Sequence, residues 1–308
     1  MVFGVCLLYI LIFICCCGAK KPCPAAIPIE DIQNAFLASK IVYEDNLQIG
    51  KIIPYSGFQI KNVEQEYFTE GGAGIKVLLA EKGYTTIVAF RGTDGPDQLG
   101  QQLFSSLKNF HGSAVTFGGT RTSVNTFFWE AFKLLLPGIR SKLQDQARKY
   151  IITGHSLGGA MATILSIFMK DDGGNMWENP ASCLITFGEP RVGNGAFAKK
   201  HDEMIAPSRK LRFVNNLDPV PHIPLWPAAQ HHSREIWMTK GLWTRRDYWK
   251  VCKEMDPLSC SNLWTVFPRV KDHEMKEYED KIMTPPKKFY DKNSKIYYRW
   301  LNTLRNSC

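Results

Sequence analysis

The segment Ile151–Ala160, which reads Ile-Ile-Thr-Gly-His-Ser-Leu-Gly-Gly-Ala, constrains the fold of this chain more than any other. Its apolar beginning is typical of a buried strand, and a helical pattern of apolar positions follows it. Ser156 stands between the two, flanked by Gly154 and Gly158. Because glycine lacks a Cβ, strand and helix can approach closely while the serine takes a strained conformation. The segment predicts a sharp strand–turn–helix corner with the Ser156 hydroxyl above a sheet edge.

The remainder of the chain alternates between strand and helix patterns, which predicts an α/β fold with a central, mostly parallel sheet and helices on both faces. The turn Lys82–Tyr84 predicts one antiparallel hairpin. We find no linker and expect one domain, residues 19–308. The expected strands are Ile75–Ala80, Thr85–Phe90, Tyr150–Thr153, Ser182–Phe187, Leu211–Val214 and Glu235–Met238. The expected helices are Ile29–Tyr43, Thr126–Gln146 and Leu157–Lys170.

The first seventeen residues are almost wholly apolar and end in small residues before Lys20 and Lys21. This run is short for a membrane-spanning helix, which needs about 20 residues. We therefore expect residues 1–18 to be a cleaved signal peptide of a secreted protein, the alternative being an uncleaved anchor. An uncleaved anchor would favour a membrane-tethered interaction protein.

Five cysteines would remain after cleavage, and in an oxidising compartment some of them should pair. Cys252 and Cys260 bracket a short polar segment, and Cys23 and Cys308 lie near the two chain ends. The first pair would close a small loop, and chain ends often lie close together in a domain, so we expect the disulfides Cys252–Cys260 and Cys23–Cys308, although the sequence alone does not determine the connectivity. Cys183 falls in an apolar strand pattern and is expected as a free buried thiol.

A formal net charge of +9 is spread along the chain rather than gathered in one run. No basic tract or aromatic motif of nucleic-acid-binding proteins accompanies it, so we expect no nucleic-acid partner. No cluster of His, Cys and Asp has the spacing of metal ligands, and we expect no metal and no cofactor.

A G-x-S-x-G pentad at such a corner is typical of hydrolases with a serine nucleophile. The serine needs a histidine base and an acid that orients it, which follow in the order Ser, acid, His in α/β-hydrolases. Asp218 comes just after an apolar strand pattern, on a proline-stiffened loop, where it would reach the same sheet edge. Alternatively, Asp218 caps a turn before Pro219. The residues alone leave the histidine open among His222, His231, His232 and His273.

Catalysis by such a serine also needs two backbone donors aimed at the developing oxyanion. One is expected from the amide of Leu157, the residue after the serine. The other is expected from Thr93, which follows the strand pattern ending at Phe90 and a turn at Gly92. Taken alone, that turn is also consistent with an ordinary loop.

Five motifs occur in order over roughly residues 60–280: Phe90–Thr93, Thr153–Ala160, Phe187–Asn194, Asn216–Pro221, and Asp272-His273 with Tyr278. Together they resemble the fungal-type triacylglycerol lipases (class 3 lipases). The resemblance implies an α/β-hydrolase fold with Ser156 as nucleophile, Asp218 as orienting acid and His273 as base. It assigns the oxyanion role to Thr93 and Leu157, and it agrees with the two expected disulfides. Glu189 departs from the family pattern, which has small residues before Pro-Arg.

The segment after Thr93 has an amphipathic pattern, with Leu99, Leu103, Leu107 and Phe110 spaced as on one helical face. A core-facing surface helix would also give this pattern. In lipases of the resembled family a lid lies at this place, so we expect a helical lid whose apolar face meets a lipid interface. Glycines at 95, 112, 118 and 119 are candidate hinges.

The leading hypothesis is a serine ester hydrolase that acts on acylglycerols, most of all triacylglycerols, at a lipid–water interface without metal or cofactor. A phospholipase or other acyl esterase is the alternative within this class, because the shape of the acyl pocket does not follow from the sequence. A catalytically silent lipid-binding protein on the same fold is the alternative from another class.

Overall fold

A computed structural model describes residues 27–67, 74–92, 110–225, 227–240, 247–252, 260–264 and 268–283. The expected signal peptide, Thr93, most of the expected lid and the pair Cys23–Cys308 lie outside these residues. Within the described ranges, no helix is long and apolar enough to cross a membrane.

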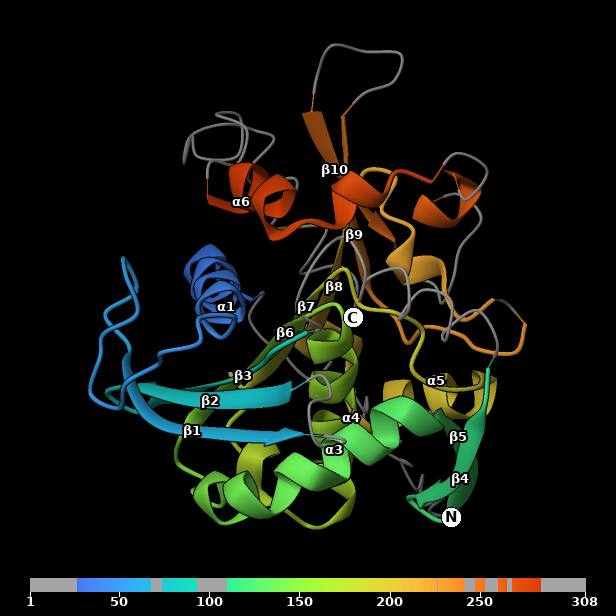
Figure 1. Ribbon diagram of the computed structural model, residues 1–308. Coiled ribbons are helices and arrows are strands. Elements are labelled where there is room, and N and C mark those ends of the chain that lie inside the picture. The colour runs from blue at the N-terminus through green and yellow to red at the C-terminus, as the bar shows by residue number, and fades with distance from the viewer. Residues whose placement is uncertain are drawn as a thin grey trace, which may run out of the picture.

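One eight-stranded sheet runs through the molecule in the order β1-β2-β3-β6-β7-β8-β9-β10 (Figure 1). Five neighbouring strands, β3, β6, β7, β8 and β9, are parallel to one another. At the two edges of the sheet the pairing is antiparallel, between β1 and β2, β2 and β3, and β9 and β10. A separate hairpin is formed by β4 and β5. The bounds are β1 Gln59–Tyr67, β2 Gly74–Lys82, β3 Thr85–Phe90, β4 Gly112–Phe117, β5 Thr120–Asn125, β6 Lys149–His155, β7 Cys183–Phe187, β8 Lys210–Asn215, β9 Glu235–Lys240 and β10 Asp247–Cys252.

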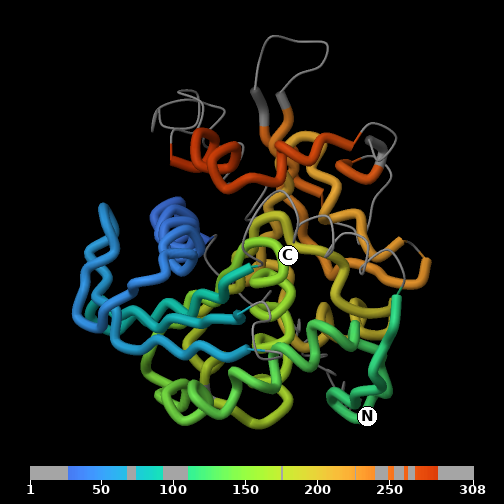
Figure 2. The backbone as a smooth tube through the Cα atoms, in the orientation of Figure 1, coloured from blue at the N-terminus to red at the C-terminus, as the bar shows by residue number. Residues whose placement is uncertain are grey.

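Helices cover both faces of this sheet, with α1 and α6 on one side and α3, α4 and α5 on the other (Figures 1 and 2). Asparagine side chains begin two of them: Asn125 accepts the backbone N–H groups of Phe127 and Phe128 at α3, and Asn194 accepts that of Phe197 at α5. The α-helices are α1 Ile29–Ile41, α3 Thr126–Ile139, α4 Leu157–Asp171, α5 Gly195–Met204 and α6 Met275–Met283. Short 3-10 turns are η1 Arg140–Leu143, η2 Asn175–Trp177, η3 Pro207–Arg209, η4 Val220–His222, η5 Ser261–Trp264 and η6 Val270–His273.

The alternation of side chains along each strand divides the core into two apolar layers. In β3, Val88 and Phe90 face the layer under α3 and α4, whereas Ile87 and Ala89 face the layer under α1 and α6. Because both faces are covered, the parallel strands are buried along almost their whole length, and most of their residues are apolar. The molecule therefore has the α/β-hydrolase architecture that the sequence predicted.

All six expected strands are present, and β2 and β3 form the expected hairpin. The expected helix Thr126–Gln146 is too long, because α3 ends at Ile139, just after Pro137 and Gly138. Six further elements are present that the sequence pattern does not predict: the strands β1, β4, β5 and β10 and the helices α5 and α6. Two of the expected hinge glycines, Gly118 and Gly119, form the tight β4–β5 turn and have positive φ values.

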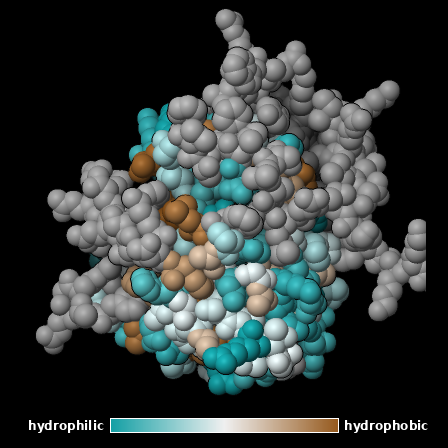
Figure 3. All heavy atoms as spheres, turned by 90° about the vertical axis from the view of Figure 1, so that its right-hand side faces the viewer, coloured by the Kyte–Doolittle hydropathy of each residue, from teal (hydrophilic) through white to brown (hydrophobic). Residues whose placement is uncertain are grey.

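Cys252 and Cys260 form the disulfide that was expected, with a Cα–Cα distance of 6.4 Å. It ties the end of the edge strand β10 to the segment before η5. Cys183 is a free, buried thiol in β7, also as expected. Figure 3 shows the side on which β4, β5 and α5 lie, where hydrophobic residues occur in small groups among hydrophilic ones.

A prediction concerns the close approach at the corner. A Cβ built at Gly158 would lie 2.2 Å from the backbone oxygen of Phe90, so Gly158→Ala must displace a helix or a strand. We expect it to lower the free energy of unfolding by about 2 kcal/mol or more, measured by urea denaturation. Gly83→Asn is the matched control, since Gly83 has positive φ but a Cβ there would meet no atom within 4 Å. Equal stability of the two variants would contradict the packing argument.

Candidate active site

The serine corner lies at the end of β6, where the chain turns into α4. Ser156 has φ 57° and ψ −130° and is the residue before the first turn of α4. Its backbone N–H donates to the carbonyl of Phe187 at the end of β7, at 2.9 Å. Glycine is required on both sides, because a Cβ at Gly154 would lie 2.2 Å from the backbone of Gly158. This is the strained strand–turn–helix corner that the sequence predicted.

The turn that follows β3 passes directly beside this serine. A Cβ built at Gly92 would lie 3.1 Å from the Cβ of Ser156 and 2.7 Å from the carbonyl oxygen of His155. Thr93, the next residue, lies outside the described part of the chain. Leu157 is the first residue of α4 and is buried, so its backbone N–H belongs to the unpaired donors at a helix start.

Asp218 follows β8 at the same sheet edge and is fully buried. Its Oδ1 accepts the backbone N–H of Val220 at 2.9 Å. The Nδ1 of His273 lies 3.0 Å from Oδ1 and 2.9 Å from Oδ2. An ionised carboxylate only accepts, so Nδ1 of His273 carries the proton of this hydrogen bond; in the neutral ring Nε2 then holds the lone pair.

The structure thus pairs Asp218 with His273 among the four candidate histidines. His231 directs its Nε2 to the carbonyl of Pro221, and the Nδ1 of His232 lies 2.6 Å from the carbonyl of Ser233. Both of these rings are therefore engaged by backbone carbonyl groups. His222 lies in η4, immediately after the loop proline Pro221.

A tyrosine completes the surroundings of this carboxylate. The Tyr278 hydroxyl donates to Oδ2 of Asp218 at 2.6 Å and accepts the backbone N–H of Asn215 at 3.1 Å. Tyr278 lies in the first turn of α6, so that helix is anchored to the end of β8. Tyr278 belongs to one of the sequence motifs, but nothing in the sequence shows which group its hydroxyl contacts.

Asp272, next to His273, fixes the loop that carries this histidine. Its carboxylate accepts the side-chain amide of Asn216 at 2.9 Å and the backbone N–H of Leu217 at 3.2 Å. Its carbonyl accepts the side-chain amide of Asn215 at 2.8 Å. The loop is therefore attached to the same strand end that carries Asp218.

Two opposing effects set the pKa of Asp218. Burial raises it, but the charge on His273 and the hydrogen bonds from His273, Tyr278 and Val220 outweigh burial, so the pKa lies below its ordinary value. Burial and the neighbouring carboxylate of Asp218 in turn raise the pKa of Tyr278 well above its ordinary value. The pair therefore holds an ionised carboxylate beside a neutral phenol.

Glu189, the residue that departs from the family pattern, is buried behind α4. It accepts the hydroxyl of Thr163 at 2.8 Å and that of Thr186 at 2.5 Å. A Cβ built at Gly159 would lie 3.1 Å from Glu189, which shows how closely it packs against the first turn of α4. Its hydrogen bonds join β7 to α4 rather than reaching the Asp218–His273 pair.

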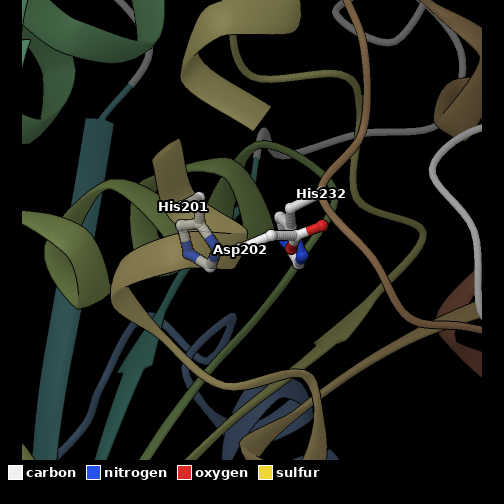
Figure 4. Close-up of side chains that lie close together, drawn as sticks. All are labelled: His201, Asp202 and His232. Atoms are coloured by element: carbon white, nitrogen blue, oxygen red, sulfur yellow. The ribbon is translucent and has the colours of Figure 1, made fainter. Parts of the chain in front are cut away.

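One group of possible metal ligands, His201, Asp202 and His232, lies between α5 and the segment before β9 (Figure 4). The buried ammonium of Lys210 lies 3.0 Å from Nδ1 of His201 and 2.5 Å from Oδ1 of Asp202. The Nε2 of His201 is hydrogen-bonded to Ser166 at 2.9 Å. Since Lys210 already supplies the positive charge and the ring nitrogens are engaged, this donor set fits a polar network better than a metal site.

A second group comprises Glu235, Cys252 and Cys260. Its two sulfur atoms are joined in the disulfide and therefore offer no thiolate to a metal.

A prediction follows from the lowered pKa of Asp218. A carboxylate whose folded-state pKa is depressed stabilises the fold above its unfolded-state pKa, and this contribution is lost as the pH falls through the folded-state value. Tyr278→Phe removes a hydrogen bond to the ionised form, so it should cost about 1.5–3 kcal/mol near neutral pH. The part due to Asp218 should disappear as the pH falls through the lowered folded-state pKa of this carboxyl, as measured by urea denaturation at several pH values.

The loss of the bond to Asn215 is independent of pH and should remain under acidic conditions. The control is Tyr150→Phe. Tyr150 lies near the start of β6, at the end of the strand opposite Ser156, so its stability cost should show no such acid dependence. A stability cost of Tyr278→Phe that is constant from neutral to acid pH would contradict the assignment.

Known proteins resemble this chain over its central part. Residues 87–228 match the family described as Lipase (class 3). A lipase of Caenorhabditis elegans is 31% identical over 194 residues, which cover 54% of this chain and 51% of that protein. The Rhizomucor miehei lipase is 32% identical over 163 residues, covering 49% of this chain and 42% of that protein. The chain therefore spans about half the length of these relatives, or less.

Solved structures agree over a longer stretch. The lipase of Rhizopus microsporus var. chinensis matches with a TM-score of 0.64 at 21% identity, covering 82% of this chain and 92% of that one. The Rhizomucor miehei triacylglyceride lipase matches with a TM-score of 0.62 at 22% identity, covering 80% and 90%. At this identity the likeness shows the fold. The chain has the α/β-hydrolase fold, and its residues 87–228 are similar to the class 3 lipase family.

Proposed function

We propose that this protein is a carboxylic ester hydrolase, a triacylglycerol lipase that works at a lipid–water interface. The observation that carries the proposal is the Asp218–His273 pair, with its 2.9 Å hydrogen bond, at the sheet edge where Ser156 adopts its strained corner. A serine, a histidine and a buried acid in these relative roles form the constellation of serine hydrolases on many folds. Relatives named as lipases favour the lipid ester as substrate.

In the proposed mechanism, the Ser156 hydroxyl attacks the ester carbonyl while Nε2 of His273 takes its proton. Ionised Asp218 holds Nδ1–H of His273 and stabilises the imidazolium that forms. The backbone N–H groups of Leu157 and Thr93 stabilise the oxyanion of the tetrahedral intermediate. His273 then returns the proton to the leaving alcohol, and an acyl-enzyme remains on Ser156. Water, deprotonated by His273, attacks this ester, and His273 returns that proton to the Ser156 oxygen as the fatty acid leaves.

The protein is further proposed to be secreted, with residues 1–18 as signal peptide and residues 19–308 as one hydrolase domain. Its apolar beginning supports this, and so do relatives named as secreted mono- and diacylglycerol lipases in Fusarium solani and Penicillium camembertii. The disulfide Cys252–Cys260 is consistent with an oxidising compartment.

The test of the proposed activity is Ser156→Ala against a panel of emulsified triacylglycerol, diacylglycerol, phospholipid and a soluble short-chain ester. We expect wild-type protein to hydrolyse the acylglycerols best, and the variant to lose at least about 10⁴-fold in kcat because the nucleophile is absent. A fluorophosphonate probe should label wild type but not the variant.

Ser113→Ala, in β4, is the matched control and should keep both activity and labelling. Preference for phospholipid would move the assignment to a phospholipase. Lipid binding by wild type without hydrolysis or labelling would instead identify a silent lipid-binding protein.

The proposed lid carries Leu99, Leu103, Leu107 and Phe110 on one face, of which Phe110 alone belongs to the described residues. Leu103→Asp places a charge on the face that would enter lipid, so we expect it to lower activity on emulsified long-chain substrate by about tenfold or more. Hydrolysis of the soluble short-chain ester should change little.

Ser105→Asp adds the same charge to the opposite, polar face and serves as control. Equal losses on emulsion and soluble ester for Leu103→Asp would rule out an interfacial lid.

A further inference from the structure

The histidine inside the serine pentad, His155, contacts both the backbone and the ring of His273. Its Nε2 lies 2.8 Å from the carbonyl oxygen of His273, although 118 residues separate the two in the sequence. The two imidazole rings are stacked, with centroids 4.5 Å apart and an interplanar angle of 29°. On its other side, Nδ1 of His155 lies 2.9 Å from the hydroxyl of Tyr43.

We propose that His155 and Tyr43 are positioning residues that hold the loop of the base His273 against the strand of the nucleophile. This inference rests on the proposed function, because it concerns the geometry of the same reaction. Both residues act through His273 and need no contact with substrate.

The hydrogen bonds define the protonation of His155. A carbonyl oxygen can only accept, so Nε2 of His155 carries the proton that it donates to His273. Nδ1 then holds the lone pair, and the Tyr43 hydroxyl donates to it. Burial, followed by the charge on His273, lowers the pKa of His155 to about 3. His155 therefore stays neutral, in one tautomer, at the pH values at which esters are hydrolysed.

The loop of His273 needs such support because no sheet strand carries it. His273 is the last residue of the short turn η6, and α6 begins two residues later. Asp272 attaches this loop to the end of β8 through its bonds to Asn216 and Leu217. His155 adds a second attachment, to the end of β6, one residue before Ser156. The base is thus tied separately to the strand of the acid and to that of the nucleophile.

The ring of His273 is also confined from the side of β7. Gly188 has φ 57°, and a Cβ there would lie 2.9 Å from Cε1 and 3.0 Å from Nδ1 of His273. With His155 stacked on it and Asp218 holding Nδ1, the ring has little freedom to rotate away. Restricting the reacting groups to one geometry is a recognised source of catalytic rate.

Tyr43 extends the arrangement to the turn after β3. It follows α1 and is partly buried against the apolar layer on that side of the sheet. A Cβ built at Gly92 would lie 2.2 Å from the hydroxyl oxygen of Tyr43 and would overlap it. This hydroxyl therefore contacts the turn that leads into Thr93. Tyr43 therefore contacts both His155 and the approach to the proposed oxyanion donor.

The kinetic test uses Tyr43→Phe, His155→Leu and His155→Gln on a soluble ester. We expect Tyr43→Phe to lower kcat about tenfold, the equivalent of one hydrogen bond in rate, with little change in KM. His155→Leu should lower kcat about 100-fold, because the donor to His273 and the stacked ring are both lost. His155→Gln should recover part of this loss, since its side-chain N–H can donate to the same carbonyl.

Two controls separate positioning from general destabilisation. His201→Gln removes another buried, stacked histidine that is hydrogen-bonded to Ser166 and Lys210, and it should keep kcat within about twofold. Tyr150→Phe is the matching tyrosine control. An equal fall in kcat for His201→Gln, or a rise in KM with unchanged kcat for Tyr43→Phe, would overturn the proposal.

A second measurement does not depend on ester hydrolysis. In the Ser156→Ala protein, long-range proton–nitrogen NMR correlations should show His155 as the Nε2–H tautomer without titration between about pH 5 and 9. The Nδ1 proton of His273 should exchange faster with water in Tyr43→Phe and His155→Leu. Titration of His155 in this range, or unchanged exchange in both variants, would refute the positioning role. If wild type hydrolyses no ester while these signals behave as expected, the proposed function fails and the structural arrangement stands.

Discussion

The structure depends on a backbone contact among three segments at one corner. The carbonyl of Phe90 in β3, the strand residue Gly154 and the helix residue Gly158 approach so closely that a side chain on either glycine would overlap the backbone. This contact fixes the direction of α4 relative to the sheet and leaves Ser156 with a positive φ at the helix start. Every other group of the candidate site has to be brought to this fixed point.

The acid and the base reach that point by different means. Asp218 follows the buried strand β8, so the sheet itself places its carboxylate, which is then enclosed with hydrogen-bond partners. His273 lies on a short turn, η6, and side-chain and backbone hydrogen bonds hold it instead. The position of the base therefore depends on these hydrogen bonds, whereas the sheet itself places the acid.

The sequence predicted those parts of the molecule whose local pattern and tertiary environment agree. Runs such as Thr85–Phe90 are apolar on both sides and were identified as strands. Strand β1 does not follow from the sequence pattern, because its residues Asn62 to Tyr67 are mostly polar and partly exposed. Its extended conformation depends on its pairing with β2. Helix α6 was missed for a similar reason, since its sequence is strongly charged.

The candidate site shows the same division. The motif and the strand context predict Ser156 and Asp218. They do not determine which of four histidines is the base, and only the family resemblance indicates His273. The contact of Asp218 with His273, the Tyr278 hydroxyl and the hydrogen bonds of His155 are all long-range. Lys210 is another example of a contact that the sequence does not predict: nothing near it in the sequence shows that its ammonium lies between His201 and Asp202.

Two tyrosine hydroxyls support the acid–base pair, that of Tyr278 directly and that of Tyr43 through His155. Both come from one helical layer, because Tyr43 follows α1 and Tyr278 lies on α6. These helices contact each other through Gln33 and the carbonyl of Ile282, and through the ion pair of Lys40 with Glu279. Proteins open locally in cooperative units that differ in stability. If this layer detaches as such a unit, both hydroxyls leave while the sheet and α4 remain folded. Such a state would lack the alignment of Asp218 and His273 and still have most of its secondary structure.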